Sequence, residues 1–371
     1  MARIVAHRPC QKVNNGGTVS AMRKTFIALT ALLAASASSV LGQASANIAA
    51  GRAQPSPLAP SEIVANSPKG DWTAIPQTDL LVMDLAPDAK GKPRRVVIQL
   101  MPPPFSQGWI GNIRKLAAAH WWDGTAMNRV QDNYVVQWGD PDADDKVKAK
   151  ALPTGLAKVP ESEYVSNFGL TTLGGNLPNL GLYRSSRRLT KKDLLVTIPS
   201  GVTGGYPTTA GFRSGWAVAF ALHDDAASKR ETSIWPIHCY GMVGVGRDLS
   251  PNTGTGAELY TVIGHAPRHL DRNIALVGRV IEGIEFLSSL PRGHGALGFY
   301  DLAQGDERTG IVSIRIGTEV AGLPSYEYLS TESQSFAAYA DARANRRDAF
   351  FIRPAGGADV CNIPVPVRRV K

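Results

Sequence analysis

The residue types that commonly perform catalysis occur in this 371-residue chain in several patterns that match no complete motif. Gly244-x-Gly246 resembles the start of a dinucleotide-binding loop, but the third glycine and the strand–helix–strand context are missing. His265 and His269 have the spacing of helical zinc ligands, but Pro267 lies between them and no glutamate occupies the metalloprotease position. No Gly-x-Ser-x-Gly elbow of a hydrolase is present. These patterns therefore argue against nucleotide, zinc and serine-hydrolase chemistry.

Three other blocks combine an arginine, an amide and apolar side chains in an ordered series. The first joins Asn128 and Arg129 to the stretch 134–140 (YVVQWGD), the second is 252–260 (NTGTGAELY), and the third is 269–283 (HLDRNIALVGRVIEG). An arginine stays protonated at every physiological pH, so Arg129 can always donate hydrogen bonds. Taken singly, these residues are more typical of strand cores and solvated surfaces, and only the joint pattern indicates a site.

In this order, the blocks resemble those of the cyclophilin family of peptidyl-prolyl cis–trans isomerases. The family's blocks read roughly Phe-His-Arg with Phe-Met-x-Gln-Gly-Gly-Asp, then Asn-x-x-Gly-Ser-Gln-Phe-Phe, then Trp-Leu-Asp-Gly-x-His-x-x-Phe-Gly-x-Val. A helix with Asn112, Ile113 and Leu116 is also similar to one in the family. The resemblance covers about residues 78–140 and 238–317. It implies a mainly β fold, a closed antiparallel eight-stranded barrel capped by two helices, with a long loop-rich insertion and a C-terminal extension.

The resemblance also implies a role for individual residues. Arg129 matches the family's catalytic arginine, and Gln137 matches the glutamine that binds the substrate backbone. The implied substrate-binding residues are Tyr134, Val135, Gln137, Glu258, Tyr260, His269 and Leu270. Several positions depart from the family pattern: Glu258 replaces a glutamine, His269 a tryptophan, Ile274 the pocket histidine, Trp138 a glycine, and Tyr134 and Tyr260 replace phenylalanines. These departures bear on the substrate profile and on the catalytic rate.

The reaction that the resemblance implies makes and breaks no covalent bond. Rotation about a prolyl amide disrupts C–N resonance, with a barrier of about 18–20 kcal/mol, and the imide nitrogen recovers its lone pair in the twisted state. A donor aimed at that nitrogen binds the transition state better than either ground state. Arg129 would supply this donor, and an apolar pocket would hold the proline ring. We therefore expect proline-containing polypeptides as substrates, no cofactor and no metal.

Apolar runs predict the elements that would position these blocks. The runs 80–85 and 95–100 flank a turn at 88–93 and predict a hairpin. The stretch 110–119 has apolar residues on one face and predicts a helix. Further strands are predicted at 134–138, 259–263, 274–280 and 311–316, a short helix at 281–290, and another helix at 332–350. In 141–235, only 194–198 and 216–222 predict strands, so we expect a local subdomain or lid.

The N-terminal segment has the pattern of a secretory signal. Met22-Arg23-Lys24 is a short positive start, residues 26–33 are apolar, and Ala44-Ser45-Ala46 is a small-x-small cleavage site. The apolar run is marginal for a spanning helix, which needs about 20 residues, so we expect no membrane span after signal removal. We predict translation from Met22 and a periplasmic or secreted protein. The expected divisions are a signal segment 1–46, a linker 47–75, an isomerase domain 76–320 containing the insertion 141–235, and an extension 321–371.

Composition and charge exclude several classes of protein and of partner. With 43% hydrophobic and 19% charged residues, the chain has ordinary globular usage, which excludes collagen-like, fully disordered and multi-span membrane classes. The net charge is +9, but residues 1–46 hold five basic residues and no acid. The rest of the chain therefore carries +4, so we expect no nucleic-acid partner. Cys239 and Cys361 remain after signal removal, in a compartment where pairing is possible, and their pairing stays open, as does the oligomeric state.

The sequence thus predicts a peptidyl-prolyl cis–trans isomerase, or rotamase, that acts on X-Pro bonds of exported proteins. The alternative is a proline-binding chaperone module in which the departures have weakened or inactivated the isomerase site. A third possibility is a structural or envelope-attachment role for the insertion and the extension, independent of the barrel.

Overall fold

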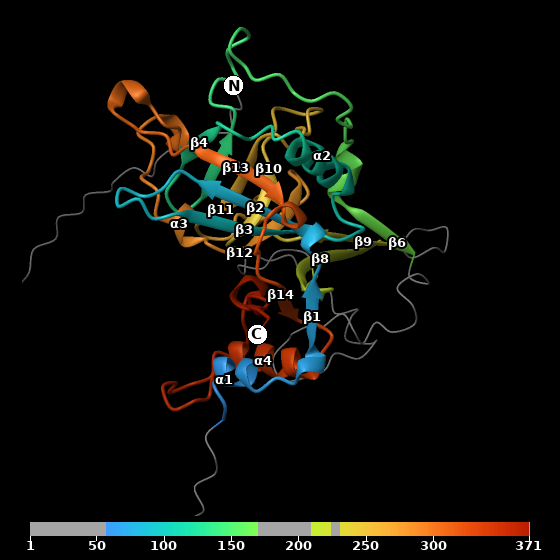
Figure 1. Ribbon diagram of the computed structural model, residues 1–371. Coiled ribbons are helices and arrows are strands. Elements are labelled where there is room, and N and C mark those ends of the chain that lie inside the picture. Colours follow the sequence, from blue (N-terminus) through green and yellow to red (C-terminus); the bar gives the residue numbers. More distant parts are fainter. Residues whose placement is uncertain (1–56, 170–208, 224–230, 371) are drawn as a thin grey trace, which may run out of the picture. The chain divides into compact units, whose positions relative to one another are not determined.

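The computed structural model describes residues 57–169, 209–223 and 231–370 (Figure 1). The predicted signal segment, its start at Met22 and the strand predicted at 194–198 lie outside these residues. Within the described ranges, no helix combines the length and the hydropathy that a membrane crossing requires.

The largest sheet of the described chain is antiparallel and eight-stranded, in the order β13-β2-β3-β12-β10-β11-β5-β4. Its strands are β2 (Leu80–Leu85), β3 (Arg94–Leu100), β4 (Ala126–Val130), β5 (Val135–Gly139), β10 (Met242–Val245), β11 (Leu259–Val262), β12 (Leu276–Glu282) and β13 (Ile311–Ile316). The two outermost strands meet, because Ala126 bridges to Gly310 and the Ile311 N–H donates to the Thr125 carbonyl at 2.7 Å. The sheet is therefore a nearly closed barrel, as the resemblance implied, and its last seam is an isolated bridge.

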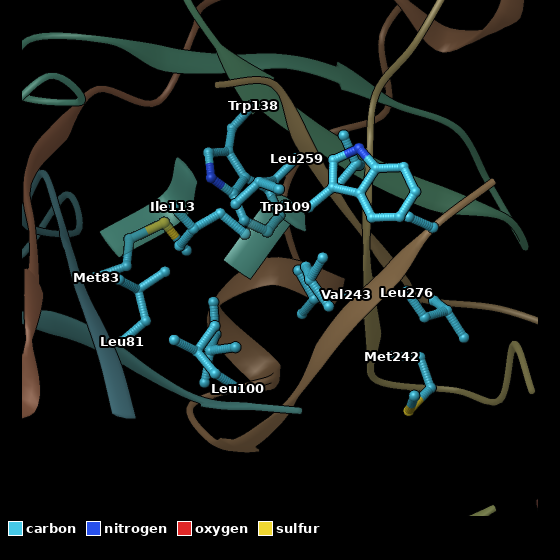
Figure 2. Close-up of a cluster of buried hydrophobic side chains, with 14 of the residues drawn as sticks. Leu81, Met83, Leu100, Trp109, Ile113, Trp138, Met242, Val243, Leu259 and Leu276 are labelled. Carbon is cyan, nitrogen blue, oxygen red and sulfur yellow. The ribbon is translucent and has the colours of Figure 1, made fainter. Parts of the chain in front are cut away.

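Apolar side chains from the strands and from α2 (Gln107–Ala118) fill the core of the barrel. Figure 2 shows Leu81 and Met83 of β2, with Trp109 and Ile113 of α2, among the side chains of this buried cluster. The buried residues of α2 recur every three or four positions, so one face of the helix is apolar: Trp109, Ile110, Ile113, Leu116 and Ala117. The predicted helix at 110–119 is confirmed, and it begins three residues earlier.

The second capping helix is shorter than predicted. The sequence predicted a helix over 281–290, but α3 spans Glu285–Ser288 only. Strand β12 runs on to Glu282, and Gly283 then adopts a φ of +83°, which separates the strand from the helix. Leu287 of α3 is fully buried and joins the barrel core.

The described part of the insertion contains a second antiparallel sheet, in the order β6-β9-β8-β7. Its strands are β6 (Ser166–Gly169), β7 (Thr209–Arg213), β8 (Trp216–His223) and β9 (Glu231–Pro236). The strand predicted at 216–222 is confirmed as β8, whereas β6, β7 and β9 were not predicted. Trp216, Val218 and Ile234 belong to the same buried cluster as the barrel core. These residues pack on the barrel, while Ala219, Trp235 and Ile237 form a separate buried cluster.

A third sheet joins residues from both ends of the described chain. Strand β1 (Trp72–Ile75) pairs with β14 (Tyr326–Leu329), which pairs with β15 (Val367–Arg369). Helix α1 (Pro60–Ala65) contacts α4 (Gln334–Ala344). A helix was predicted at 332–350, and α4 confirms it but ends at Ala344.

The segment 47–75 was predicted to be a linker, yet residues 60–75 form α1 and β1. They do so because Trp72 and Ile75 find buried apolar partners that lie about 250 residues away, which local composition does not reveal. The cysteine pairing that the sequence left open is also resolved. Cys239 and Cys361 form a disulfide that ties the C-terminal extension to the chain just before β10.

Candidate active site

Arg129 lies on β4 with its side chain almost entirely buried, at 2% exposure. The register of β4 against β5 shifts between Met127 and Arg129, and this bulge brings Arg129 opposite Gln137. The guanidinium donates from Nε to the Leu297 carbonyl at 2.8 Å and from Nη1 to Gln137 Oε1 at 3.3 Å. Nη2 donates to Gln131 Oε1. Backbone and amide oxygens therefore hold the guanidinium in one orientation.

Two aromatic rings flank the guanidinium. Its central carbon lies 5.6 Å from the centre of the Tyr134 ring and 5.3 Å from that of the Phe299 ring. Burial lowers the pKa of Arg129, while the neighbouring Tyr134 and Glu258 raise it. Among the described residues, no carboxylate lies within ion-pair distance of Arg129. The positive charge is thus solvated by oriented dipoles and ring faces and is not neutralised by direct contact.

Gln137 connects Arg129 to Glu258. Its amide oxygen accepts from Arg129, and its amide nitrogen donates to Glu258 Oε1. An arginine can only donate and a carboxylate can only accept, so this chain fixes which way the amide points. Burial raises the pKa of Glu258, and the hydrogen bond from Gln137 opposes that rise. Two glycines leave room for the glutamate: a Cβ on Gly246 would lie 2.9 Å from Glu258 Cγ, and one on Gly139 would lie 3.3 Å from its Cα.

An apolar floor adjoins this polar chain. Strands β5 and β11 pair so that Val135 faces Val262 and Gln137 faces Tyr260. Since side chains alternate along a strand, these four residues share one face of the barrel wall. Val135, Tyr260 and Val262 form a buried cluster, against which Tyr134 and Ile274 pack. Ile274 therefore adds to the apolar surface at the position where the family has a histidine.

The remaining two predicted residues lie in a single turn of 3₁₀ helix, η6 (Arg268–Leu270). The exposed His269 ring stacks on the Tyr134 ring, with centroids 6.2 Å apart and planes 11° from parallel. Leu270 is the next residue of the turn and is half-buried. The structure thus brings Arg129, Tyr134, Val135, Gln137, Glu258, Tyr260 and His269 together through direct contacts or shared strand faces. The substrate-binding and catalytic roles of these residues stay predictions.

Sequence reasoning missed several residues of this region. Leu297 and Phe299 contact Arg129 from beyond the third block, and nothing in their local sequence marks them. His238 was assigned no role in the site from the sequence, yet its Nε2 lies 2.8 Å from the Tyr260 hydroxyl oxygen and its Nδ1 lies 2.8 Å from Asp271 Oδ1. The polar Tyr260, in place of an apolar ring, was the one available signal that a buried partner exists.

The described residues contain no group of three or more histidine, cysteine or acidic side chains placed to hold a metal ion. A cavity of about 410 Å³ lies between residues 156–159 and 251–255, and none of the predicted site residues lines it.

Comparison with known proteins places this chain in a family. A family model described as "Cyclophilin type peptidyl-prolyl cis-trans isomerase/CLD" matches residues 108–299, just over half of the chain. The chain therefore belongs to the cyclophilin-type peptidyl-prolyl cis–trans isomerases, a family of enzymes whose members bind proline-containing polypeptides. The predicted family and fold class are confirmed.

Solved structures with a similar fold include the cyclophilin AquaCyp293 from Hirschia baltica. It has 19% sequence identity and a TM-score of 0.56, and the match covers 81% of this chain and 94% of that one. A cyclophilin type peptidyl-prolyl cis-trans isomerase from Cryptosporidium parvum matches with 12% identity and a TM-score of 0.33, over 64% of this chain and 97% of that one. No curated protein matches the sequence.

Proposed function

We propose that Arg129 catalyses the prolyl isomerisation that family membership indicates, by donating a hydrogen bond to the imide nitrogen of a twisted X-Pro amide. The observation that carries this mechanism is the guanidinium itself: it is buried, held by oxygens of Leu297 and Gln137, and paired with no carboxylate within the described chain. A donor that is already oriented needs no reorganisation when the lone pair forms. Its attraction for that lone pair is also stronger in a site from which water is excluded.

The neighbouring residues suit the two ends of such a substrate. The apolar cluster of Val135, Tyr260 and Val262 would hold the proline ring. The Gln137 amide uses one of its two N–H groups on Glu258, so one N–H and one oxygen lone pair remain for the backbone beside the proline. One side of the X-Pro bond would thus be fixed while the other rotates past Arg129.

Isomerisation of a short X-Pro peptide by the purified protein tests this mechanism. We expect Arg129→Ala to lower kcat/KM by about 10²–10³-fold, the usual loss for one preorganised donor. Arg292→Ala is the matched control, because Arg292 is partly exposed and pairs with the exposed Asp132. Equal rates for Arg129→Ala and an active parent would refute the assigned role of Arg129.

A proline-binding chaperone module is the second candidate. It is favoured by one specific contact, in which the Glu258 carboxylate occupies an N–H of Gln137. In that case the parent would bind a proline peptide, as measured by calorimetry, while its isomerisation rate would equal that of the buffer.

We also propose that the substrates are exported proteins and that this chain is itself exported. The signal pattern in 1–46 and a disulfide between Cys239 and Cys361 both fit an oxidising compartment. Expression of the full chain in a bacterium, followed by fractionation and N-terminal sequencing, tests this. A mature protein that begins at residue 47 outside the cytoplasm is expected, and an uncleaved cytoplasmic chain would contradict it.

A further inference from the structure

His238 lies between β9 and β10 with both ring nitrogens engaged and 1% of its surface exposed. Nε2 contacts the hydroxyl of Tyr260, and Nδ1 contacts the carboxylate of Asp271 at the end of η6. We infer that His238 is a positioning residue of the isomerase site, which fixes the Tyr260 wall of the proline pocket relative to the turn that carries His269 and Leu270. This inference rests on the proposed function, because it assigns Tyr260 to the proline pocket.

The direction of each hydrogen bond follows from the partners. The Asp271 carboxylate accepts from the His238 backbone N–H at 3.0 Å, from Nδ1 at 2.8 Å and from Arg268 Nε at 2.6 Å. Because a carboxylate only accepts, Nδ1 carries the proton and Nε2 is free to accept from the Tyr260 hydroxyl. Burial lowers the pKa of His238 and raises that of Tyr260, which keeps both groups neutral in this arrangement.

The buried hydroxyl of Tyr260 requires a hydrogen-bond partner, which His238 provides. The ring lies over Gly244, its partner on β10, where a Cβ would stand 2.3 Å from the hydroxyl oxygen. The glycine therefore allows the ring to lean across β10 until it stacks with the imidazole, at 6.3 Å between centroids and 6° between planes. A phenylalanine needs no polar partner here, whereas a buried hydroxyl without one is costly. His238 and Tyr260 thus form a matched pair in this chain.

The other side of His238 holds the η6 turn. Arg268 begins this turn and Asp271 follows its last residue, so their ion pair brackets His269 and Leu270. The His238 backbone and ring both bind the same carboxylate, which attaches the turn to the barrel. The C-terminal extension reaches the same cluster, because Arg268 Nη1 lies 3.9 Å from Asp359 Oδ2. One imidazole therefore links two walls of the predicted pocket.

Two substitutions separate the two contacts of His238. An asparagine amide reaches about as far as Nδ1, so His238→Asn can keep the bond to Asp271 but leaves Tyr260 without an acceptor. We expect His238→Asn to raise KM for an X-Pro peptide about tenfold, as loss of one buried hydrogen bond predicts, and to change kcat by less than about twofold. In Tyr260→Phe the hydroxyl is absent, so adding His238→Asn to that variant should change KM by less than about twofold.

An effect of His238→Asn on KM that is equal in the parent and in the Tyr260→Phe variant would overturn the inference, as would a parent-like KM for His238→Asn alone. If the parent binds the peptide without isomerising it, the parent, the two single variants and the double variant are compared by their dissociation constants instead of KM. Failure of the proposed activity is thereby distinguished from failure of the positioning role.

A second measurement uses the unmodified full chain and needs no turnover. In ¹⁵N-histidine-labelled protein at neutral pH, two-bond ¹H–¹⁵N spectra identify which ring nitrogen carries the proton. We expect a neutral His238 with the proton on Nδ1, which Asp271 imposes. A proton on Nε2, or a charged ring, would mean that the Tyr260 hydroxyl is not held as described, and the inference would be wrong. Because this measurement uses the parent protein, it decides the question even if a variant fails to fold.

Discussion

The disulfide between Cys239 and Cys361 allows a quantitative prediction about stability. The two cysteines are separated by 122 positions, so the bond closes a long loop in the unfolded chain. For a loop of that length, the loss of unfolded-state entropy corresponds to about 5 kcal/mol at 25 °C. Cys239 packs against the barrel core and against a cluster of the insertion sheet, so both of these regions are tied to the extension. We expect Cys239→Ala with Cys361→Ala to lower the free energy of unfolding by about that amount.

Urea unfolding followed by tryptophan fluorescence measures this change. The oxidised parent, the reduced parent and the double variant are compared at equal protein concentration, with free thiols counted by alkylation and mass spectrometry. The reduced parent should unfold at nearly the same urea concentration as the double variant, and a reductant should not affect the double variant. Identical midpoints for the oxidised and the reduced parent would refute the reasoning, because the bond would then add nothing to the stability of the fold.

Two further predictions concern the candidate site. Burial raises the pKa of Glu258, so its ionised form disfavours the folded state. Glu258→Gln should therefore raise the free energy of unfolding at neutral pH, by about 1.4 kcal/mol for each unit by which the pKa is raised. In urea unfolding, the difference in stability between this variant and the parent should shrink as the pH falls through the raised pKa toward 4.5. A difference that does not change with pH would contradict this prediction. Gly244→Ala should displace Tyr260, since the new Cβ would lie 2.3 Å from its hydroxyl oxygen, and should raise KM in the peptide assay, whereas the control Gly310→Ala meets no atom within 4 Å and should leave KM unchanged.

Strand periodicity made much of the candidate site predictable. Val135 and Gln137 alternate along one apolar run, and Tyr260 lies in another, so once two runs pair in the barrel their pocket-facing residues fall on one side. The family blocks supplied the pairing that periodicity alone could not. For Arg129, periodicity alone gave no prediction, because its strand β4 was not predicted from its own five residues. Its position opposite Gln137 also depends on a bulge in β4.

The parts that sequence reasoning missed depend on contacts between distant segments. The residues of β1 have no period that distinguishes them from a linker, and their burial comes from β14, about 250 residues further on. The role of His238 could not be predicted from local sequence either, because a single histidine forms no spaced motif. Its role follows from its contacts with Asp271 and Tyr260, which lie 33 and 22 positions away. Side-chain chemistry of this kind becomes visible only when the chain is folded.

The order in which the barrel strands pair determines how much of the barrel can fold while the chain is being synthesised. β2 ends at Leu85, but β13, its partner on one edge, begins at Ile311. A nascent or truncated chain that stops before β13 therefore carries a bare edge of β2, and unpaired edges are templates for association between molecules. Pairings this remote also fold slowly. The barrel can close only when most of the polypeptide is available, so incomplete chains are the form most exposed to aggregation.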